Sequence, residues 1–318
     1  MKNFLSVKDV GNIEQLVELA LSYKVNPLRD QKLGTNKRLG LLFFNPSLRT
    51  RVSTQLAAKN LGMDAIVLNV GAEGWSLEFA EGAVMNGTSV EHIKDAAPVL
   101  GSYFDILAIR TFPKFLNRED DQNEQVMNAF IKYAKVPIVS LESATLHPLQ
   151  SLADIITITE QFKEKRKPKV VLTWAPHIKA IPHCVGNSFA EWINAWGKAD
   201  FVIAQPKGYE LSHRFTHGAQ ITYDQKSALE GADFVYVKNW STFEPYGQVL
   251  GEHPGWMLTE KSFEIAKNKN AKVMHCLPLR RNVELSDEIL DGPRNILTSL
   301  AQNRVWSAQA VLSEVLRG

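Results

Sequence analysis

The sequence has few cysteines and no long apolar run, and these two absences exclude broad classes of protein. Cys184 and Cys276 are the only cysteines among 318 residues, and they give neither a disulfide framework nor the spacing of metal ligands. No apolar run is long enough to span a bilayer, and charges at Lys2, Lys8 and Asp9 interrupt the first residues too early for a secretory signal. We therefore expect a cytoplasmic protein with reduced thiols, no metal site and no membrane partner.

An excess of one charge and glycine-rich phosphate loops are also missing. Lys and Arg number 36 against 34 Asp and Glu, and these charges are interspersed, so no basic stripe indicates a nucleic-acid partner. No G-x-G-x-x-G follows a predicted strand, and no G-x-x-x-x-G-K-[ST] is present. These absences argue against a dinucleotide-dependent oxidoreductase and against a P-loop NTPase.

What the sequence does contain is an alternation of short apolar runs with helical patterns, in a chain long enough for two domains. Strands are predicted at 39–44, 65–68, 105–109, 136–141, 169–174, 201–204, 233–237 and 272–275. Helices are predicted at 12–23, 52–61, 91–101, 124–135, 147–162, 181–196 and from 299 onward. The alternation predicts two parallel-sheet α/β domains with a boundary near residues 147 to 168.

The strand that ends near Phe44 is followed by a tight turn and a helix that begins with two arginines. Ser47 is a good N-cap, and Arg49 and Arg51 lie in or next to the first helical turn. Cations there oppose the helix dipole unless an anion offsets them, whereas free N–H groups and guanidinium donors suit a phosphate. The alternative is a plain cap with solvated arginines. We favour an anion-binding site.

Arg110 and His147 stand at positions that suggest a crevice shared with Arg49, and Arg304 is a further cation that needs an explanation. Arg110 and His147 each follow a predicted strand, at the sheet edge where open α/β folds bind ligands. Arg304 is expected in the first turn of the last helix, where it would also oppose the dipole. The alternatives are a surface arginine and a packed histidine beside Pro148.

Four segments together resemble motifs of the aspartate/ornithine carbamoyltransferases, in the family's order and across nearly the whole chain. They are Ser47-Leu48-Arg49-Thr50-Arg51, His147-Pro148-Leu149-Gln150, His275-Cys276-Leu277-Pro278 and Asn303-Arg304 with Trp306. The resemblance implies a carbamoyl phosphate-binding domain at 1–147, completed by a C-terminal helix at 298–318, and an acceptor-binding domain at 148–297. It also implies a homotrimer with its sites at subunit interfaces.

The resemblance also implies roles for individual residues. Catalysis would rest on Thr50, Arg110, His147 and Arg304. Carbamoyl phosphate would be bound by Ser47, Leu48 (backbone), Arg49, Thr50, Trp75, Arg110, His147, Gln150, Cys276, Leu277 and Arg304, with Trp75 in the loop that family members lend to a neighbouring subunit. In the implied reaction a primary amine attacks the carbamoyl carbon while fixed positive groups stabilise the carbonyl oxygen and the departing phosphate. This chemistry requires no metal or organic cofactor.

The second substrate is indicated by a departure from the ornithine-type pattern. Lys238 stands where ornithine carbamoyltransferases place an aspartate that pairs with the α-ammonium of ornithine, and a lysine would repel that group. The loop that follows, Ser241 to Pro245, differs as well. The sequence therefore resembles the N-acylornithine branch, although Lys238 could instead extend to solvent from a strand end. The residues proposed to bind the acylated amino acid are Glu142, His177, Lys238, Arg280 and Val90.

Val90 bears on the acyl group, because the acetyl branch tends to carry Glu and the succinyl branch Pro at the aligned position. The uncharged Val90 favours N-succinylornithine, whereas its branched side chain could narrow the pocket and favour N-acetylornithine. We expect a carbamoyltransferase of arginine synthesis with N-succinylornithine as acceptor and N-acetylornithine as the alternative. A catalytically silent anion-binding paralogue is the alternative from another class, and the intact motifs argue against it.

Overall fold

The computed structural model describes residues 1–72, 74–251 and 253–318 and divides the chain into two compact units. The first unit contains Met1–Leu149 and Arg304–Gly318, and the second contains Gln150–Asn303. The sequence-based division has its boundaries at residues 147 and 298. Each unit is described separately below.

The first unit is built on a four-stranded parallel sheet in the order β2-β1-β5-β6. Its strands are β1 (Arg38–Phe43), β2 (Asp64–Asn69), β5 (Ile106–Arg110) and β6 (Ile138–Glu142). Its helices are η1 (Val7–Asp9), α1 (Ile13–Val25), α2 (Leu48–Asn60), α3 (Ile93–Tyr103), α4 (Arg118–Gln122) and α5 (Gln125–Tyr133). Strand periodicity and caps explain these elements: Asn12 and Ser47, for example, cap α1 and α2 with their side chains.

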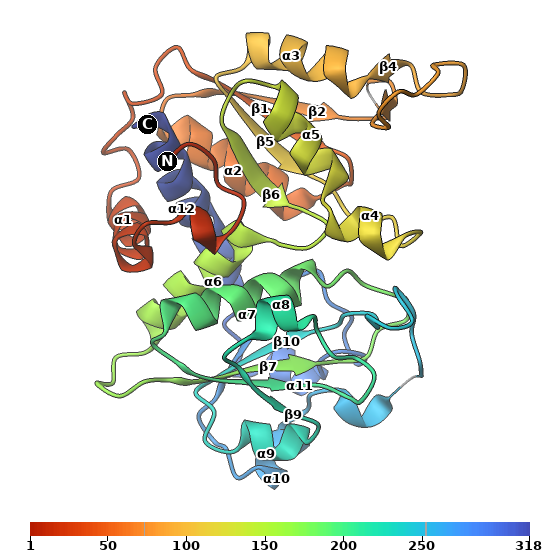
Figure 1. Ribbon diagram of the computed structural model, residues 1–318. Helices are drawn as coiled ribbons and strands as arrows, with labels where there is room; N and C mark the ends of the chain where they lie inside the picture. The colour runs from red at the N-terminus through yellow and green to blue at the C-terminus, as the bar shows by residue number, and fades with distance from the viewer. Residues whose placement is uncertain (73, 252) are drawn as a thin grey trace. The chain divides into compact units, whose positions relative to one another are not determined.

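A layer of helices covers one face of this sheet. Leu42, Leu107 and Ile109 of the strands pack with Met127 and Phe130 of α5 in one buried cluster. Helix α3 lies against α5 on the same side, as Figure 1 shows. Burial of this face fixes the register of the strands, and with it the positions of the polar residues at their carboxyl ends.

The second unit is built on a five-stranded parallel sheet in the order β11-β10-β7-β8-β9. Its strands are β7 (Lys169–Trp174), β8 (Asp200–Ala204), β9 (Gln220–Thr222), β10 (Phe234–Lys238) and β11 (Lys272–Met274). Its helices are α7 (Cys184–Trp196), α8 (His213–Thr216), α9 (Gln225–Leu229), η2 (Pro254–Trp256), α10 (Glu260–Ile265) and α11 (Asp287–Leu290).

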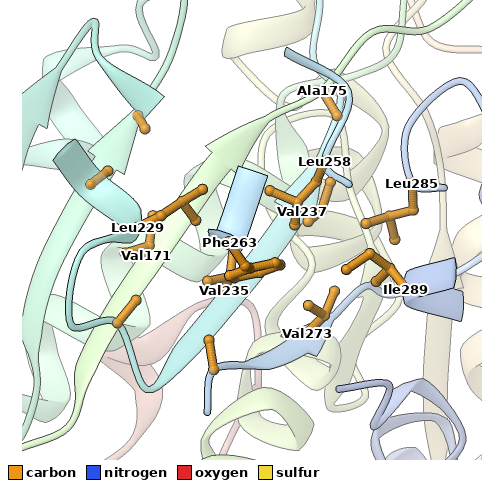
Figure 2. Packing of buried hydrophobic residues seen from close by; sticks show 14 of the residues in the cluster. Val171, Ala175, Leu229, Val235, Val237, Leu258, Phe263, Val273, Leu285 and Ile289 are labelled. Carbon is orange, nitrogen blue, oxygen red and sulfur yellow. The ribbon is translucent and has the colours of Figure 1, made fainter. Parts of the chain in front are cut away.

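One continuous core supports the central strands of the second sheet. Figure 2 shows Val235 and Val237 of β10 and Val273 of β11 packed around Phe263 of α10 and next to Ile289 of α11. These valines are buried on a parallel sheet, where β-branched side chains are typical. The core anchors β10 and β11, whose carboxyl ends carry Lys238 and His275.

Several helices differ from the sequence-based expectation at their first residues, and two of these differences bear on candidate residues. The helix expected at 91–101 begins at Ile93 instead, because Glu91 and His92 form the short strand β4, which pairs with β3 (Leu77–Glu78). The last helix, α12 (Leu297–Leu316), begins before residue 299, so Arg304 is the eighth helical residue. The prediction that Arg304 opposes the dipole in the first turn was therefore wrong, since that effect decays within one turn.

Helix α6 (Pro148–Gln161) follows His147 directly, and both α6 and α12 contain residues of the two units. In the part of the chain that the structure describes, no helix has the length and apolar character needed to cross a bilayer.

Candidate active site

The start of α2 has the capped geometry that the sequence predicts. The Ser47 hydroxyl accepts a hydrogen bond from the backbone N–H of Thr50 at 3.3 Å. Arg51 donates to the side-chain oxygen of Asn69 and its guanidinium lies 5.1 Å from the centre of the Phe43 ring, so it is engaged within the unit. Arg49 is half-buried in the first turn. The helix thus begins with a cap and a cation at the positive end of its dipole, which are features of an anion site.

Arg304 approaches the same turn from the other end of the chain. Its Nη2 donates to Thr50 Oγ1 at 2.8 Å, and both side chains are buried. The position of Arg304 is therefore explained by its burial and by this hydrogen bond, and not by the helix dipole. The structure therefore brings Thr50 and Arg304 together within the first unit.

A second group of polar side chains lies at the ends of β5 and β6. A register shift in the pairing of these strands places Arg110 beside Glu142. Arg110 Nη1 donates to Glu142 Oε2, and His147 Nε2 lies 3.3 Å from the same oxygen. All three side chains are buried, so the Glu142 carboxylate holds a cation and an imidazole together out of water. Glu142, which the sequence assigned to the acylornithine, is thus in contact with two carbamoyl phosphate candidates.

The electrostatic surroundings keep His147 neutral. Burial lowers the pKa of His147 to about 3; Glu142 opposes this shift, and the charges of Arg304 and Arg110 add to it. Among the described residues, His147 Nδ1 and Arg110 Nε are buried without a hydrogen-bond partner. Such orphaned polar atoms are rare in folded proteins and are expected where a polar ligand supplies the missing bonds.

Trp75 and Val90 lie on neighbouring segments at the surface of the first unit. The backbone N–H of Val90 donates to Ser76 O at 3.0 Å, and Trp75 Nε1 donates to Glu91 Oε2 at 2.6 Å. Trp75 is 57% exposed and Val90 65%. The structure therefore brings these two candidates together on a projecting segment.

The remaining carbamoyl phosphate candidates belong to the second unit. Gln150 is buried and its Nε2 donates to Asp154 Oδ1 at 2.9 Å, while its Oε1 has no partner among residues 1–72, 74–251 and 253–318. Cys276 and Leu277 follow β11, and Leu277 has a left-handed backbone with φ 56°. This conformation is unusual for a bulky residue and indicates a loop whose carbonyl directions are tightly specified.

A buried carboxylate organises the acceptor candidates of the second unit. Lys238 ends β10 and is only 7% exposed, so it does not extend to solvent. Burial alone would raise the pKa of Glu284, but the hydrogen bond and charge of His275, with the charge of Lys238, lower it to about 2. Glu284 also accepts from Arg280 N at 2.7 Å. Glu284 is therefore ionised beside Lys238 and the backbone of Arg280.

His177 belongs to the same group. It is half-buried, and burial lowers the pKa of its imidazole. The charge of Glu284 raises this pKa, whereas the charges of Lys238 and Arg280 lower it. Three acceptor candidates of the second unit, His177, Lys238 and Arg280, thus lie within electrostatic range of one another or of Glu284. Glu284 itself was missed by sequence reasoning, because a single glutamate four residues after Arg280 has no recognisable motif.

No cluster of three or more potential metal-ligating side chains occurs in the described part of the chain. The first unit instead offers two buried arginines, a hydroxyl and a neutral imidazole close to a helix N-terminus. Such groups can bind a phosphate and stabilise negative charge that develops on a neighbouring oxygen.

Comparisons with known proteins agree with this geometry. Residues 2–160 match the family model of the aspartate/ornithine carbamoyltransferase carbamoyl-P binding domain, and residues 183–315 match that of the Asp/Orn binding domain. N-succinylornithine carbamoyltransferase of Bacteroides fragilis is 46% identical, with 99% of each chain covered. N-acetylornithine carbamoyltransferase of Xanthomonas axonopodis pv. citri is 35% identical, covering 98% of this chain and 96% of that protein.

Solved structures show the same likeness. N-acetyl-L-ornithine transcarbamylase in a glutamate-to-alanine variant, complexed with carbamyl phosphate and N-succinyl-L-norvaline, matches with a TM-score of 0.92 at 34% identity, covering 99% of this chain and 100% of that chain. A glutamate-to-valine variant with the same two ligands matches with a TM-score of 0.91, at the same identity and coverage. The chain therefore belongs to the aspartate/ornithine carbamoyltransferase family and is a carbamoyltransferase with the two-domain parallel-sheet fold that the sequence predicts.

Proposed function

We propose that the protein transfers the carbamoyl group of carbamoyl phosphate to the δ-amine of N-succinyl-L-ornithine, giving N-succinyl-L-citrulline and phosphate in arginine biosynthesis. The observation that carries the choice of amine is the burial of Lys238 at the end of β10, beside Glu284. A lysine at this position offers no carboxylate to pair with the α-ammonium of free ornithine, and it suits an acylated α-nitrogen. The 46% identity to N-succinylornithine carbamoyltransferase supports the same acceptor.

The proposed donor site begins at the N-terminus of α2. Its phosphate ligands are the cap and first turn of that helix, with Arg110 reaching both the phosphate and the carbonyl oxygen. The full proposed set is Ser47, Leu48, Arg49, Thr50, Trp75, Arg110, His147, Gln150, Cys276, Leu277 and Arg304. The hydrogen bond between Arg304 and Thr50 supports the assignment of both to one site in the first unit.

The proposed mechanism uses fixed donors and a neutral imidazole. The δ-amine attacks the carbamoyl carbon, negative charge develops on its oxygen, and phosphate leaves with the amine's proton. Arg110 donates to this oxygen, and the low pKa of His147 keeps the ring uncharged beside it. A ring that is neutral at pH 7 has one N–H to donate and cannot act as a general acid from a charged state.

The residues proposed to bind the acylated amino acid are Glu142, His177, Lys238, Arg280 and Val90. Lys238 and Arg280 supply positive charge for the carboxylates of the acylated amino acid, with Glu142 and His177 as further contacts. A relative with a glutamate replaced by valine was solved with N-succinyl-L-norvaline, which supports the view that an uncharged residue at that position admits a succinyl group. Val90 is the uncharged residue at the position that we align with it.

We further propose a homotrimer in a reducing cytoplasmic compartment. Leu48, Val52 and Leu56 form an exposed apolar stripe on α2, spaced one helical turn apart, and Ile66 on the adjacent edge strand β2 is exposed as well. Contiguous apolar surface of this kind is typical of subunit interfaces. Mixing Arg49→Ala chains with Trp75→Ala chains tests a shared site: partial recovery of activity is expected, whereas no recovery would show that each chain is self-contained.

The substrate assignment is tested by measuring kcat/KM for N-succinyl-, N-acetyl- and free ornithine at saturating carbamoyl phosphate. N-succinylornithine is expected to give the highest value. A higher value for N-acetylornithine would favour the second candidate, which the TM-scores of 0.92 to N-acetyl-L-ornithine transcarbamylase support. Binding of carbamoyl phosphate without turnover of any amine would contradict an enzymatic role.

A further inference from the structure

A four-residue turn joins two members of the buried cluster in the first unit. Glu142 ends β6, His147 precedes α6, and the residues between them close on themselves. Ser143 N donates to Leu146 O at 2.8 Å, and Leu146 N donates to Ser143 Oγ at 3.1 Å. The shape of this turn therefore sets the distance between the Glu142 carboxylate and the His147 ring.

The turn is held from outside by one side chain, Glu124. Its carboxylate accepts hydrogen bonds from Ser143 Oγ at 2.6 Å, from Thr145 N at 2.7 Å and from Ala144 N at 3.2 Å. Thr145 Oγ1 donates to the same carboxylate. Four donors from three consecutive residues thus converge on the Glu124 carboxylate. Hydrogen bonds to a carboxylate are stronger than those between neutral groups.

The backbone of Glu124 also has an unusual conformation. It has φ 51° and ψ 46°, the left-handed region that side chains other than glycine seldom adopt, directly before α5. A residue at this position usually caps its own helix, but within the described residues the Glu124 side chain makes no such bond and reaches the turn instead. Unfavourable backbone geometry is retained where the surroundings over-determine it, often near functional sites.

We propose that Glu124 is a positioning residue for the carbamoyl transfer, acting through the Ser143–Leu146 turn on His147 and, through Glu142, on Arg110. The inference rests on the proposed function, which assigns His147 and Arg110 to the carbonyl oxygen. Glu124 touches none of the reacting groups itself. It fixes the segment whose two ends carry the carboxylate and the imidazole, so its effect falls on the rate of the chemical step.

The competing explanation is that Glu124 only stabilises the fold. The two explanations differ in what a substitution changes once the protein is folded. A stabilising role lowers the folded fraction and leaves the turnover of each folded molecule intact, whereas a positioning role lowers kcat in protein that melts well above the assay temperature.

The test compares Glu124→Gln with Glu119→Gln, which makes the same change at an exposed position of α4. In Glu124→Gln the amide NH₂ faces donors of the turn, so we expect kcat to fall about 10- to 100-fold, because misplacement of a catalytic group by about 1 Å can cost about 100-fold. The KM for the acylornithine is expected to stay within about twofold, and Glu119→Gln is expected to match the parental protein.

A double-mutant cycle with Thr145→Val keeps the proposal testable if Glu124→Gln folds poorly. Thr145→Val removes one donor and leaves the carboxylate in place, so a kcat loss of about threefold or more is expected. Combined with Glu124→Gln, its effect is expected to be smaller than the product of the two single effects, since both act through one contact. Multiplicative effects would contradict action through the turn.

Parental kcat in folded Glu124→Gln, or a loss fully explained by its unfolded fraction, would overturn the proposal. All rates are ratios to the parental protein with the amine that it uses best. Failure of the parental protein to carbamoylate acylornithines would contradict the proposed function. The ratio of variant to parental kcat with another amine would still test the role of Glu124.

Discussion

The two units each contain a buried glutamate between a histidine and a cation, and the two groups differ in how the histidine is used. In the first unit Glu142 contacts His147 and Arg110, and His147 keeps Nδ1 without a partner among the described residues. In the second unit His275 uses both ring nitrogens: Nδ1 accepts from Leu277 N at 2.8 Å, and Nε2 donates to Glu284 at 3.3 Å.

This difference separates a group arranged to receive a ligand from one arranged to hold a loop. The His147 ring and Arg110 have hydrogen-bonding atoms left over, which is costly in a buried site unless a ligand uses them. His275 has none left over and instead supports the carboxylate beside Lys238. We therefore propose that the Glu142 group serves the chemical step and that the Glu284 group serves the selection of the amine.

The largest effect is expected from Arg110→Gln. The variant loses a donor to the carbonyl oxygen, and removing one such donor costs about 100- to 1000-fold in kcat. It also removes the cation that contacts the buried Glu142 carboxylate, which is expected to lower the free energy of unfolding by about 3–5 kcal/mol. The double variant Arg110→Gln with Glu142→Gln is expected to regain stability in urea titrations without regaining rate. Joint recovery of both properties would contradict a catalytic role.

Lys238→Met is expected to have the next largest effect, and to act on the acceptor alone. Loss of a hydrogen bond to a charged group costs about 1.5–3 kcal/mol, or about 10- to 100-fold in kcat/KM for N-succinylornithine. The KM for carbamoyl phosphate is expected to remain at the parental value. Lys179→Met, at an exposed lysine of a nearby loop, serves as the matched control. An equal loss of kcat/KM for N-succinylornithine and for carbamoyl phosphate would contradict the assignment of amine selection to the second unit.

Val90→Glu is expected to produce a smaller shift between the two acylated amines. A carboxylate about 4 Å from the succinyl carboxylate in a water-exposed site costs about 1 kcal/mol, so the ratio of kcat/KM for N-succinyl- over N-acetylornithine should fall about fivefold. Val90→Thr, which has a similar shape and no charge, should leave the ratio near the parental value. A ratio that Val90→Glu does not move would remove Val90 from the acyl site.

The smallest signal is expected from the pH dependence of His147. Its pKa of about 3 in the folded protein lies below the ordinary 6.5, so its imidazole NMR resonance, assigned with His147→Gln, should not titrate between pH 5 and 8. Because an unfolded chain binds this proton more tightly, the associated stability is present above pH 6.5 and is lost as the pH falls from 6.5 towards 3. A midpoint near 6.5 would place His147 in water.

The sequence alone was sufficient to predict the elements and caps that depend on a local residue pattern. Apolar runs located eight of the nine principal strands, β3 and β4 aside, and Ser47 was recognised as the cap of α2 because capping depends on neighbouring residues. Strand β9 and the helices α8, α9 and α11 were not predicted, because elements of three to five residues have too little periodicity to detect.

The candidate site was predictable only in part, for a related reason. Family motifs pointed to Arg110 and His147, which the structure brings together, but the contact of both with Glu142 depends on a register shift between two strands. Glu124 and Glu284 are single carboxylates whose partners are set by the turns of the folded chain. Arg304 was selected for a dipole effect that its position in α12 excludes, and its hydrogen bond to Thr50 joins residues far apart in the sequence.

The central claim is that a common donor site is combined with a site selective for N-succinylornithine. A competition experiment between amine substrates tests this claim most directly. The parental protein is given carbamoyl phosphate with equal concentrations of N-succinyl-, N-acetyl- and free ornithine, and the citrulline products are measured by mass spectrometry at low conversion. The account predicts that N-succinylcitrulline predominates and that free citrulline is the least abundant product. Predominance of free citrulline would contradict it.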